Sequence, residues 1–238
     1  MSWRRWAITA SGLITSADNK TLKLVRRLAS ARQRDKLGLF VCEGEDLVDA
    51  ARAAGVEPVE LLLAGENVEP RLLADISTLG HPPRVIGIFR REDLPRRDPP
   101  PVGLALWRVG DPGNVGTLIR TADALGPAFV ALSDDCSDPT GPKAVRASMG
   151  ALFRVPLLPF DDAPRPWVAL VPRGGASLAE VTSTTFVVGA EREGIPGDVL
   201  ERCDERATIR LAEDAESLNV ATAGAIALYE RARRRAAS

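Results

Sequence analysis

The stretch Asp111-Pro-Gly-Asn-Val-Gly-Thr-Leu-Ile-Arg-Thr-Ala122 stands directly after an apolar segment, Leu104–Val109. A strand that runs through a Gly-Asn-Val-Gly turn into a helix offers backbone N–H groups and a positive dipole end to an anion. Asn114 and Arg120 are six residues apart, so a capping asparagine and a helical arginine address one polar ligand in this interpretation. Taken alone, a stretch of this type is usually only an asparagine cap followed by a surface arginine.

Two further stretches place polar residues directly after apolar strands. In Phe186-Val-Val-Gly-Ala-Glu-Arg-Glu-Gly-Ile-Pro196, the strand runs into Gly189, and Glu191 follows on the loop. Ligands of open α/β sheets gather at the carboxyl ends of strands, so Gly189 and Glu191 are well placed for a site, and a surface loop with a solvated acid is the alternative. In Ile209–Ala221, Ser217 and Asn219 are typical caps for the alanine-rich helix that follows, and capping alone would explain them.

Around these stretches, short apolar runs alternate with amphipathic segments, which predicts an α/β fold. The continuous apolar character of the C-terminal strands favours a parallel sheet covered on both faces. In the C-terminal part we expect strands at 104–109, 129–132, 168–171, 185–188 and 207–211, and helices at 115–125, 142–149 and 219–235. In the N-terminal part we expect a small α/β unit with helices at 19–30, 43–54 and 70–79 and strands at 39–42, 59–63 and 85–89.

The segment Arg96-Arg-Asp-Pro-Pro-Pro101 is the best domain boundary in the chain. Consecutive prolines neither continue a helix nor fit a central strand, and they form extended spacers. We therefore expect a variable or disordered N-terminus at 1–13, a first domain at 14–95, a proline-rich linker at 96–102 and a second domain at 103–238.

The chain has 238 residues and a single histidine, His81. This excludes, or nearly so, a Ser-His-Asp triad elsewhere, a two-histidine zinc helix and a site of two histidines and a carboxylate. We expect no metal. Three separated cysteines without a Cys-x-x-Cys pair indicate reduced thiols, and the first residues resemble neither a signal peptide nor a membrane span. A cytoplasmic protein without a membrane segment is the expectation.

A net charge of −1 argues against a globally basic nucleic-acid-binding protein, but the charge is unevenly distributed. Seven basic residues and one acid stand between Lys20 and Lys36. Such a stretch is suited to phosphate contacts, although a solvated helix face is the plainer interpretation. The candidate phosphate contacts are Lys20, Lys23, Arg26, Arg27 and Arg34.

Together, in this order, the three stretches resemble the SpoU (TrmH-like) branch of the SPOUT methyltransferases. The family motifs stand here as Asn114-Val-Gly116 with Arg120-Thr-Ala122, Gly189-Ala-Glu191 with Gly194, and Glu216-Ser-Leu-Asn-Val220. The segment Pro142–Gly150 also resembles what this family places between its first two motifs. The resemblance spans about Leu104 to Ala232, and the basic N-terminal part resembles the small RNA-binding domain of many members.

This resemblance implies a parallel sheet with a deep trefoil knot that holds S-adenosylmethionine, and transfer of its methyl group to a ribose 2′-OH of RNA. It also implies a homodimer. The cofactor residues it implies are Gly189, Ile209, Leu211, Leu218 and Asn219. The catalytic residues it implies are Arg120, Asn114, Glu191, Ser217 and Asn219. A guanidinium loses its proton only above about pH 12, so we expect Arg120 to be essential without assigning it the role of base.

Several alternatives stay open. Where the family commonly has Ile-Pro-Met, this chain has Ile209-Arg-Leu211, which leaves room for a catalytically silent RNA-binding protein of the same fold. A nucleotide-binding enzyme that uses Gly113 and Gly116 is disfavoured because neither a P-loop nor a G-x-G-x-x-G motif is present. Ribosomal RNA is the preferred substrate over transfer RNA, and the nucleotide and a role in antibiotic resistance are not assigned.

Overall fold

The structure is a computed structural model that describes residues 12–96, 98–212 and 217–237. Most of the predicted variable N-terminus at 1–13 therefore lies outside the described residues. The chain divides into two compact units. The first runs up to Leu94 and includes Asp138–Phe153, and the second comprises Pro95–Ser137 and the chain from Arg154 onward. Each is described by itself.

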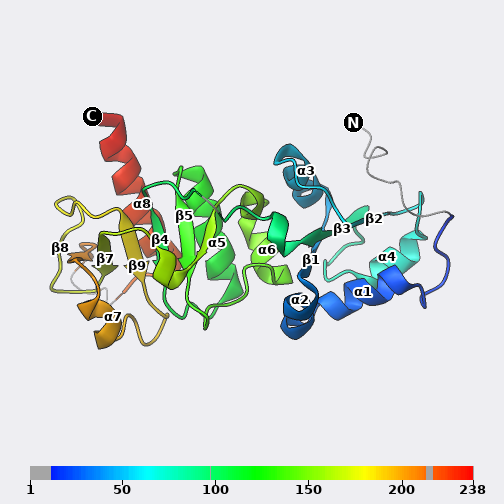
Figure 1. The fold of residues 1–238 in the computed structure, drawn as a ribbon, viewed down its shortest axis with the longest axis horizontal. Helices are drawn as coiled ribbons and strands as arrows, with labels where there is room; N and C mark the ends of the chain where they lie inside the picture. Colours follow the sequence, from blue (N-terminus) through cyan, green and yellow to red (C-terminus); the bar gives the residue numbers. More distant parts are fainter. Residues whose placement is uncertain (1–11, 97, 213–216, 238) are drawn as a thin grey trace. The chain divides into compact units, whose positions relative to one another are not determined.

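The second unit is built on a seven-stranded sheet in the order β6-β5-β4-β9-β7-β10-β8 (Figure 1). Its strands are β4 (Gly103–Leu106), β5 (Phe129–Leu132), β6 (Leu157–Pro159), β7 (Trp167–Leu170), β8 (Ala176–Ser177), β9 (Thr185–Val188) and β10 (Glu205–Thr208). Every pairing is parallel. The predicted α/β fold with a parallel sheet is confirmed, and the short edge strands β6 and β8 are the ones that the sequence pattern missed.

Helices cover both faces of this sheet. Helix α5 (Pro112–Ala124) packs against helix α8 (Val220–Ala237). A Cβ at Gly224 of α8 would overlap Leu118 of α5 and would contact Leu104 of β4, so these helices meet closely over one face. On the other face, Ala105 and Val187 pack with the short helix α7 (Gly197–Glu201) and the 3-10 helix η4 (Phe160–Asp162). The alternation of Leu104 and Ala105 between faces follows from the two-residue period of a strand.

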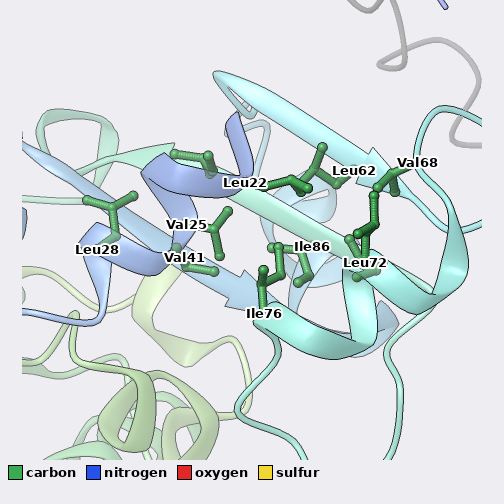
Figure 2. Close-up of a cluster of buried hydrophobic side chains, with 11 residues drawn as sticks. Leu22, Val25, Leu28, Val41, Leu62, Val68, Leu72, Ile76 and Ile86 are labelled. Carbon is green, nitrogen blue, oxygen red and sulfur yellow. The ribbon is translucent and has the colours of Figure 1, made fainter. Parts of the chain in front are cut away.

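The first unit contains a three-stranded antiparallel sheet in the order β1-β3-β2. Its strands are β1 (Leu39–Glu43), β2 (Glu60–Leu63) and β3 (Val85–Arg90). Its helices are α1 (Lys20–Leu28), α2 (Ala31–Leu37), α3 (Glu45–Ala53), α4 (Pro70–Ile76) and α6 (Pro142–Ser148), with the 3-10 helices η2 (Arg91–Asp93) and η3 (Ala151–Phe153). Figure 2 shows its core, in which Leu22 and Val25 of α1 lie against Ile86 of β3 and Ile76 of α4.

Part of the first unit comes from the middle of the chain. Phe153 joins Phe40 and Phe89 in an aromatic cluster, with ring centroids 5.3 to 6.0 Å apart. Gly150 has a φ of +82°, and a Cβ there would overlap the side chain of Ala50. The segment Asp138–Phe153 therefore packs with the first unit, which differs from the predicted domain at 103–238. No helix in the described part of the chain is long and apolar enough to cross a membrane.

Candidate active site

A cavity of about 620 Å³ lies at the carboxyl ends of the neighbouring strands β9, β7 and β10. This is the edge of a parallel sheet at which ligands bind. The lining residues come from the loops after these three strands and from the start of α8. They are Leu170, Val171, Pro172, Val188, Gly189, Ala190, Glu191, Arg192, Glu193, Gly194, Ile195, Leu200, Ile209, Leu211, Ser217, Leu218, Asn219, Val220 and Ala223.

Glycine is required at the two glycine positions of the second motif for different structural reasons. A Cβ at Gly189 would overlap the carbonyl group of Gly194, so only glycine fits this close approach of two backbone segments. Gly194 has a φ of +66°, which glycine adopts without strain. Its N–H donates to the carbonyl oxygen of Ala190 at 2.9 Å and closes the loop. The wall of the cavity is therefore formed largely by backbone at this point.

A hydrogen-bonded chain connects all three motifs. The Asn114 Nδ2 group of the first motif donates to Glu191 Oε1 of the second at 2.9 Å. The Asn219 Nδ2 group of the third motif donates to Asn114 Oδ1 at 3.2 Å. Asn219 also caps α8, because its Oδ1 accepts the N–H of Ala221 at 2.8 Å. Residues far apart in sequence thus form one polar cluster, here called the motif cluster: Asn114, Glu191 and Asn219.

The first turn of α5 differs from the prediction. Asn114 is not its cap, because the helix begins at Pro112 and Asp111 is the N-cap. Asp111 Oδ1 accepts the N–H of Asn114 at 3.0 Å, and proline suits the first helical position because it has no N–H to satisfy. The amide side chain of Asn114 is thereby left to contact Glu191 and Asn219.

The Glu191 carboxylate receives hydrogen bonds from several donors. Besides Asn114, the N–H groups of Gly110 and Asp111 approach it at 3.4 Å. Burial by itself would raise the pKa of Glu191, but the bonds from Asn114 and from backbone N–H groups together hold the pKa below its ordinary value of 4.5. Glu191 is therefore ionised at neutral pH and is a weak base. Its geometry suits a residue that fixes the start of α5.

The structure brings most of the predicted site residues together. The predicted cofactor residues Gly189, Ile209, Leu211, Leu218 and Asn219 all line the cavity, as do Glu191 and Ser217. Asn114 does not line it but contacts two residues that do. Arg120 lies on the exposed face of α5 and is not a lining residue. Within the described part of the chain, its side chain makes no ion pair or hydrogen bond.

Sequence reasoning missed the loop Leu170–Pro172 and the residues Ile195 and Leu200, which also line the cavity. The loop carries no motif, and its apolar residues resemble the strand that precedes them. The signal that would have found it is positional: β7 pairs with both β9 and β10, so the loop after β7 lies between the two loops that carry motifs.

The predicted RNA contacts fall into two groups. Lys20, Lys23, Arg26 and Arg27 are exposed on α1. The prediction that Arg34 belongs with them is wrong, because Arg34 is only 4% exposed. Its guanidinium donates to Asp138 at 2.7 Å and to the carbonyl oxygens of Leu28 and Ala29 at 2.9 Å.

Asp138 is held by a second arginine as well. Arg91 Nη2 donates to the same carboxylate oxygen at 2.6 Å. Burial by itself would raise the pKa of Asp138, but hydrogen bonds from Thr140 and Arg34 and the charge of Arg91 lower it. This ion-pair cluster fixes the segment that starts at Asp138 within the first unit, so Arg34 stabilises the fold and is not available to bind RNA.

The SpoU rRNA Methylase family matches residues 101–229, a stretch that contains the cavity and the motif cluster. The chain belongs to this family. It is 30% identical over 91% of its length to the 23S rRNA (guanosine(2553)-2′-O)-methyltransferase RlmP of Bacillus subtilis, of which it covers 97%. It is also 30% identical over 95% of its length to a 23S rRNA (uridine(2479)-2′-O)-methyltransferase of Streptomyces viridochromogenes, of which it covers 93%.

A solved structure is similar over nearly the whole chain. It is the AdoMet-bound rRNA methyltransferase from Sinorhizobium meliloti, with a TM-score of 0.82 and 30% sequence identity, over 93% of this chain and 97% of that one. The SpoU resemblance predicted from the motifs is therefore confirmed, and the likeness extends to the first unit.

Proposed function

We propose that this SpoU family protein transfers a methyl group from S-adenosylmethionine to a ribose 2′-OH of ribosomal RNA. The observation that carries the proposal is the cavity at the carboxyl ends of β9, β7 and β10. Residues of the second and third motifs line this cavity, and the hydrogen bonds of the motif cluster connect them to the first motif. The names of the relatives support the same reaction and favour ribosomal over transfer RNA.

The cavity fits the proposed methyl donor. A volume of about 620 Å³ lies in the range of cofactor pockets, which are mostly apolar with a few placed polar groups. Gly189, Ile209, Leu211, Leu218 and Asn219 would hold the donor, largely through backbone and apolar side chains. When bound, S-adenosylmethionine supplies a methyl group on a sulfonium, which is already a good electrophile. The protein therefore has to position the acceptor and assist loss of the hydroxyl proton.

The side chains of the site divide these tasks. Glu191 and Asn114 fix the first turn of α5, and Asn219 links that turn to the cap of α8. Ser217 contributes to the cavity wall. We assign Arg120 to a phosphate beside the target ribose, where its charge favours loss of the 2′-OH proton. Its exposure and the lack of a partner among the described residues support this role.

The acceptor explains why RNA is the substrate, since DNA has no 2′-OH. We propose that Lys20, Lys23, Arg26 and Arg27 on α1 bind RNA phosphates.

We also propose a trefoil knot in the second unit and a homodimer with α8 near the interface. Tyr229 on α8 is 58% exposed, which supports a contact surface there. Because bacterial ribosomal RNA is cytoplasmic, we place the protein in the cytoplasm.

The activity is tested by incubating the protein with total RNA and S-adenosylmethionine labelled on its methyl group, followed by size separation of the RNA. We expect label in ribosomal RNA and not in transfer RNA. Arg120→Ala should reduce incorporation by about 100-fold or more, the usual scale for loss of a group that assists proton transfer.

Calorimetry with S-adenosylmethionine distinguishes the remaining outcomes. Donor binding without any methyl transfer to RNA would identify a silent RNA-binding protein. Full activity of Arg120→Ala would overturn the role given to Arg120.

A further inference from the structure

Three neighbouring strands of the second unit are each followed by an exposed arginine. Arg192 follows β9, Arg173 follows β7 and Arg210 follows β10. These strands are adjacent and parallel in the sheet, so their carboxyl ends lie at one edge. Strands are spaced by about 4.8 Å, which brings the three loops within roughly 10 Å of one another where they leave the sheet. We call Arg173, Arg192 and Arg210 the arginine row.

The arginine row adjoins the cavity. Arg192 itself lines it, and Arg173 directly follows the lining residue Pro172. Arg210 stands between the lining residues Ile209 and Leu211, but it is exposed and does not line the cavity. Arg210 therefore adjoins the lining of the cavity without being part of it.

The charges of the row are not neutralised by the described residues. Within residues 12–96, 98–212 and 217–237, none of the three guanidinium groups makes an ion pair or a side-chain hydrogen bond. Arg108, which follows the next strand β4, behaves differently, because its Nε lies 3.1 Å from Asp135. Guanidinium groups without an ion-pair partner in the protein are available to bind an anion.

The chemistry of arginine suits one kind of anion in particular. The guanidinium is planar and presents paired N–H donors that match phosphate oxygens. Three such groups along a sheet edge suit a chain of consecutive phosphates better than a single small anion.

We propose that Arg173, Arg192 and Arg210 bind backbone phosphates of the RNA strand on either side of the target nucleotide. This inference rests on the proposed function, because it takes RNA as the substrate of the same cavity. The row holds the strand at the cavity rim, whereas α1 of the first unit provides a separate electrostatic contact. The competing ligand is the carboxylate of the methyl donor, and the test distinguishes the two.

The experiment measures equilibrium binding of the full-length protein to an in vitro transcript of bacterial 23S rRNA at several salt concentrations. Each lost phosphate contact to single-stranded RNA lowers the slope of log Kobs against log salt by about 0.7. The triple variant Arg173→Ala, Arg192→Ala, Arg210→Ala should therefore lose about 2 from the slope. The matched control is Arg206→Ala, an exposed arginine on β10 that does not line the cavity.

Lysine at all three positions should keep most of the slope, which separates loss of charge from damage to the fold. An unchanged slope in the triple alanine variant would overturn the proposal. So would a normal slope together with weaker binding of S-adenosylmethionine in calorimetry, because the row would then contact the donor. Failure of the proposed function is a different result: a wild-type protein that transfers no methyl group, whatever its salt dependence.

Discussion

In the second unit, the cavity loops and the start of α5 bring backbone segments and three polar side chains into fixed contact. The basic side chains of helix α1 in the first unit are exposed, and those that are paired contact only nearby surface groups. In the cavity, a single added Cβ at Gly189 has no space. In the RNA contact that we propose for α1, the charges of Lys20, Lys23, Arg26 and Arg27 act through their sum, so one can replace another. Residue identity therefore matters most where backbone packs on backbone, and least where charge contacts a flexible partner.

Arg34 is an exception to this comparison, because it belongs to the basic stretch of the sequence but is a buried structural residue. Arg34→Ala leaves Asp138 without one of its two arginine partners and should destabilise the protein by about 3 kcal/mol. Chemical denaturation measures the change. Arg32→Ala, an exposed neighbour on α2, should alter the free energy of unfolding by about 0.5 kcal/mol or less. Equal effects of the two variants would show that Arg34 is not structural.

Gly189→Ala tests the close packing of the cavity loops. Its Cβ overlaps the Gly194 carbonyl, so the loop must shift, at a cost of about 1 to 3 kcal/mol in stability. We expect S-adenosylmethionine binding to fall below detection in calorimetry, because the displaced loop is part of the cavity wall. Gly197→Ala is the control, since a Cβ at Gly197 meets nothing within 4 Å. Normal donor binding by Gly189→Ala would contradict the close packing.

Loss of basic residues from helix α1 should weaken RNA binding gradually. Arg26→Ala with Arg27→Ala should lower the slope of log Kobs against log salt for ribosomal RNA by about 1.4 to 1.8, and leave donor binding unchanged. Arg52→Ala with Arg71→Ala removes the same charge from ion-paired residues of the same unit and should leave the slope unchanged. If both pairs change the slope equally, general charge and not α1 attracts the RNA.

The smallest expected effect concerns the pH response of the motif cluster. The pKa of Glu191 is lowered in the folded protein, so its stabilising contribution is present above the ordinary value of 4.5 and is lost as pH falls through the folded value. The free energy of unfolding of the wild type should therefore fall on acidification below about pH 4.5 more steeply than that of Glu191→Gln, whose side chain does not titrate. Parallel pH profiles of the two proteins in chemical denaturation would remove Glu191 from the explanation.

The sequence predicted the features that depend on local pattern. The strands at 129–132 and 185–188 coincide with β5 and β9, because their apolar runs are bounded by glycine, proline or polar residues. The two residues of β8 are both exposed and carry no apolar pattern, so they were missed. The start of α5 was misplaced because Asn114 is a good cap by type, while Asp111 before Pro112 is the better one by geometry.

Other features depend on contacts that no local pattern contains. Arg34 is buried because Asp138, 104 residues later, lies beside it. The motif cluster needs the order of β4, β9, β7 and β10 in the sheet, which the motifs themselves do not specify. The resemblance to a family supplied the cavity residues, and the structure supplied the reason that they belong together.

The most direct test of the central claim identifies the methylated nucleoside. Ribosomal RNA labelled by the protein is digested to nucleosides, and the labelled product is separated and identified. Transfer to the ribose predicts a single labelled 2′-O-methyl nucleoside, whose phosphodiester bond in the intact RNA resists alkaline cleavage. Label on a base would contradict the account, as would label confined to transfer RNA.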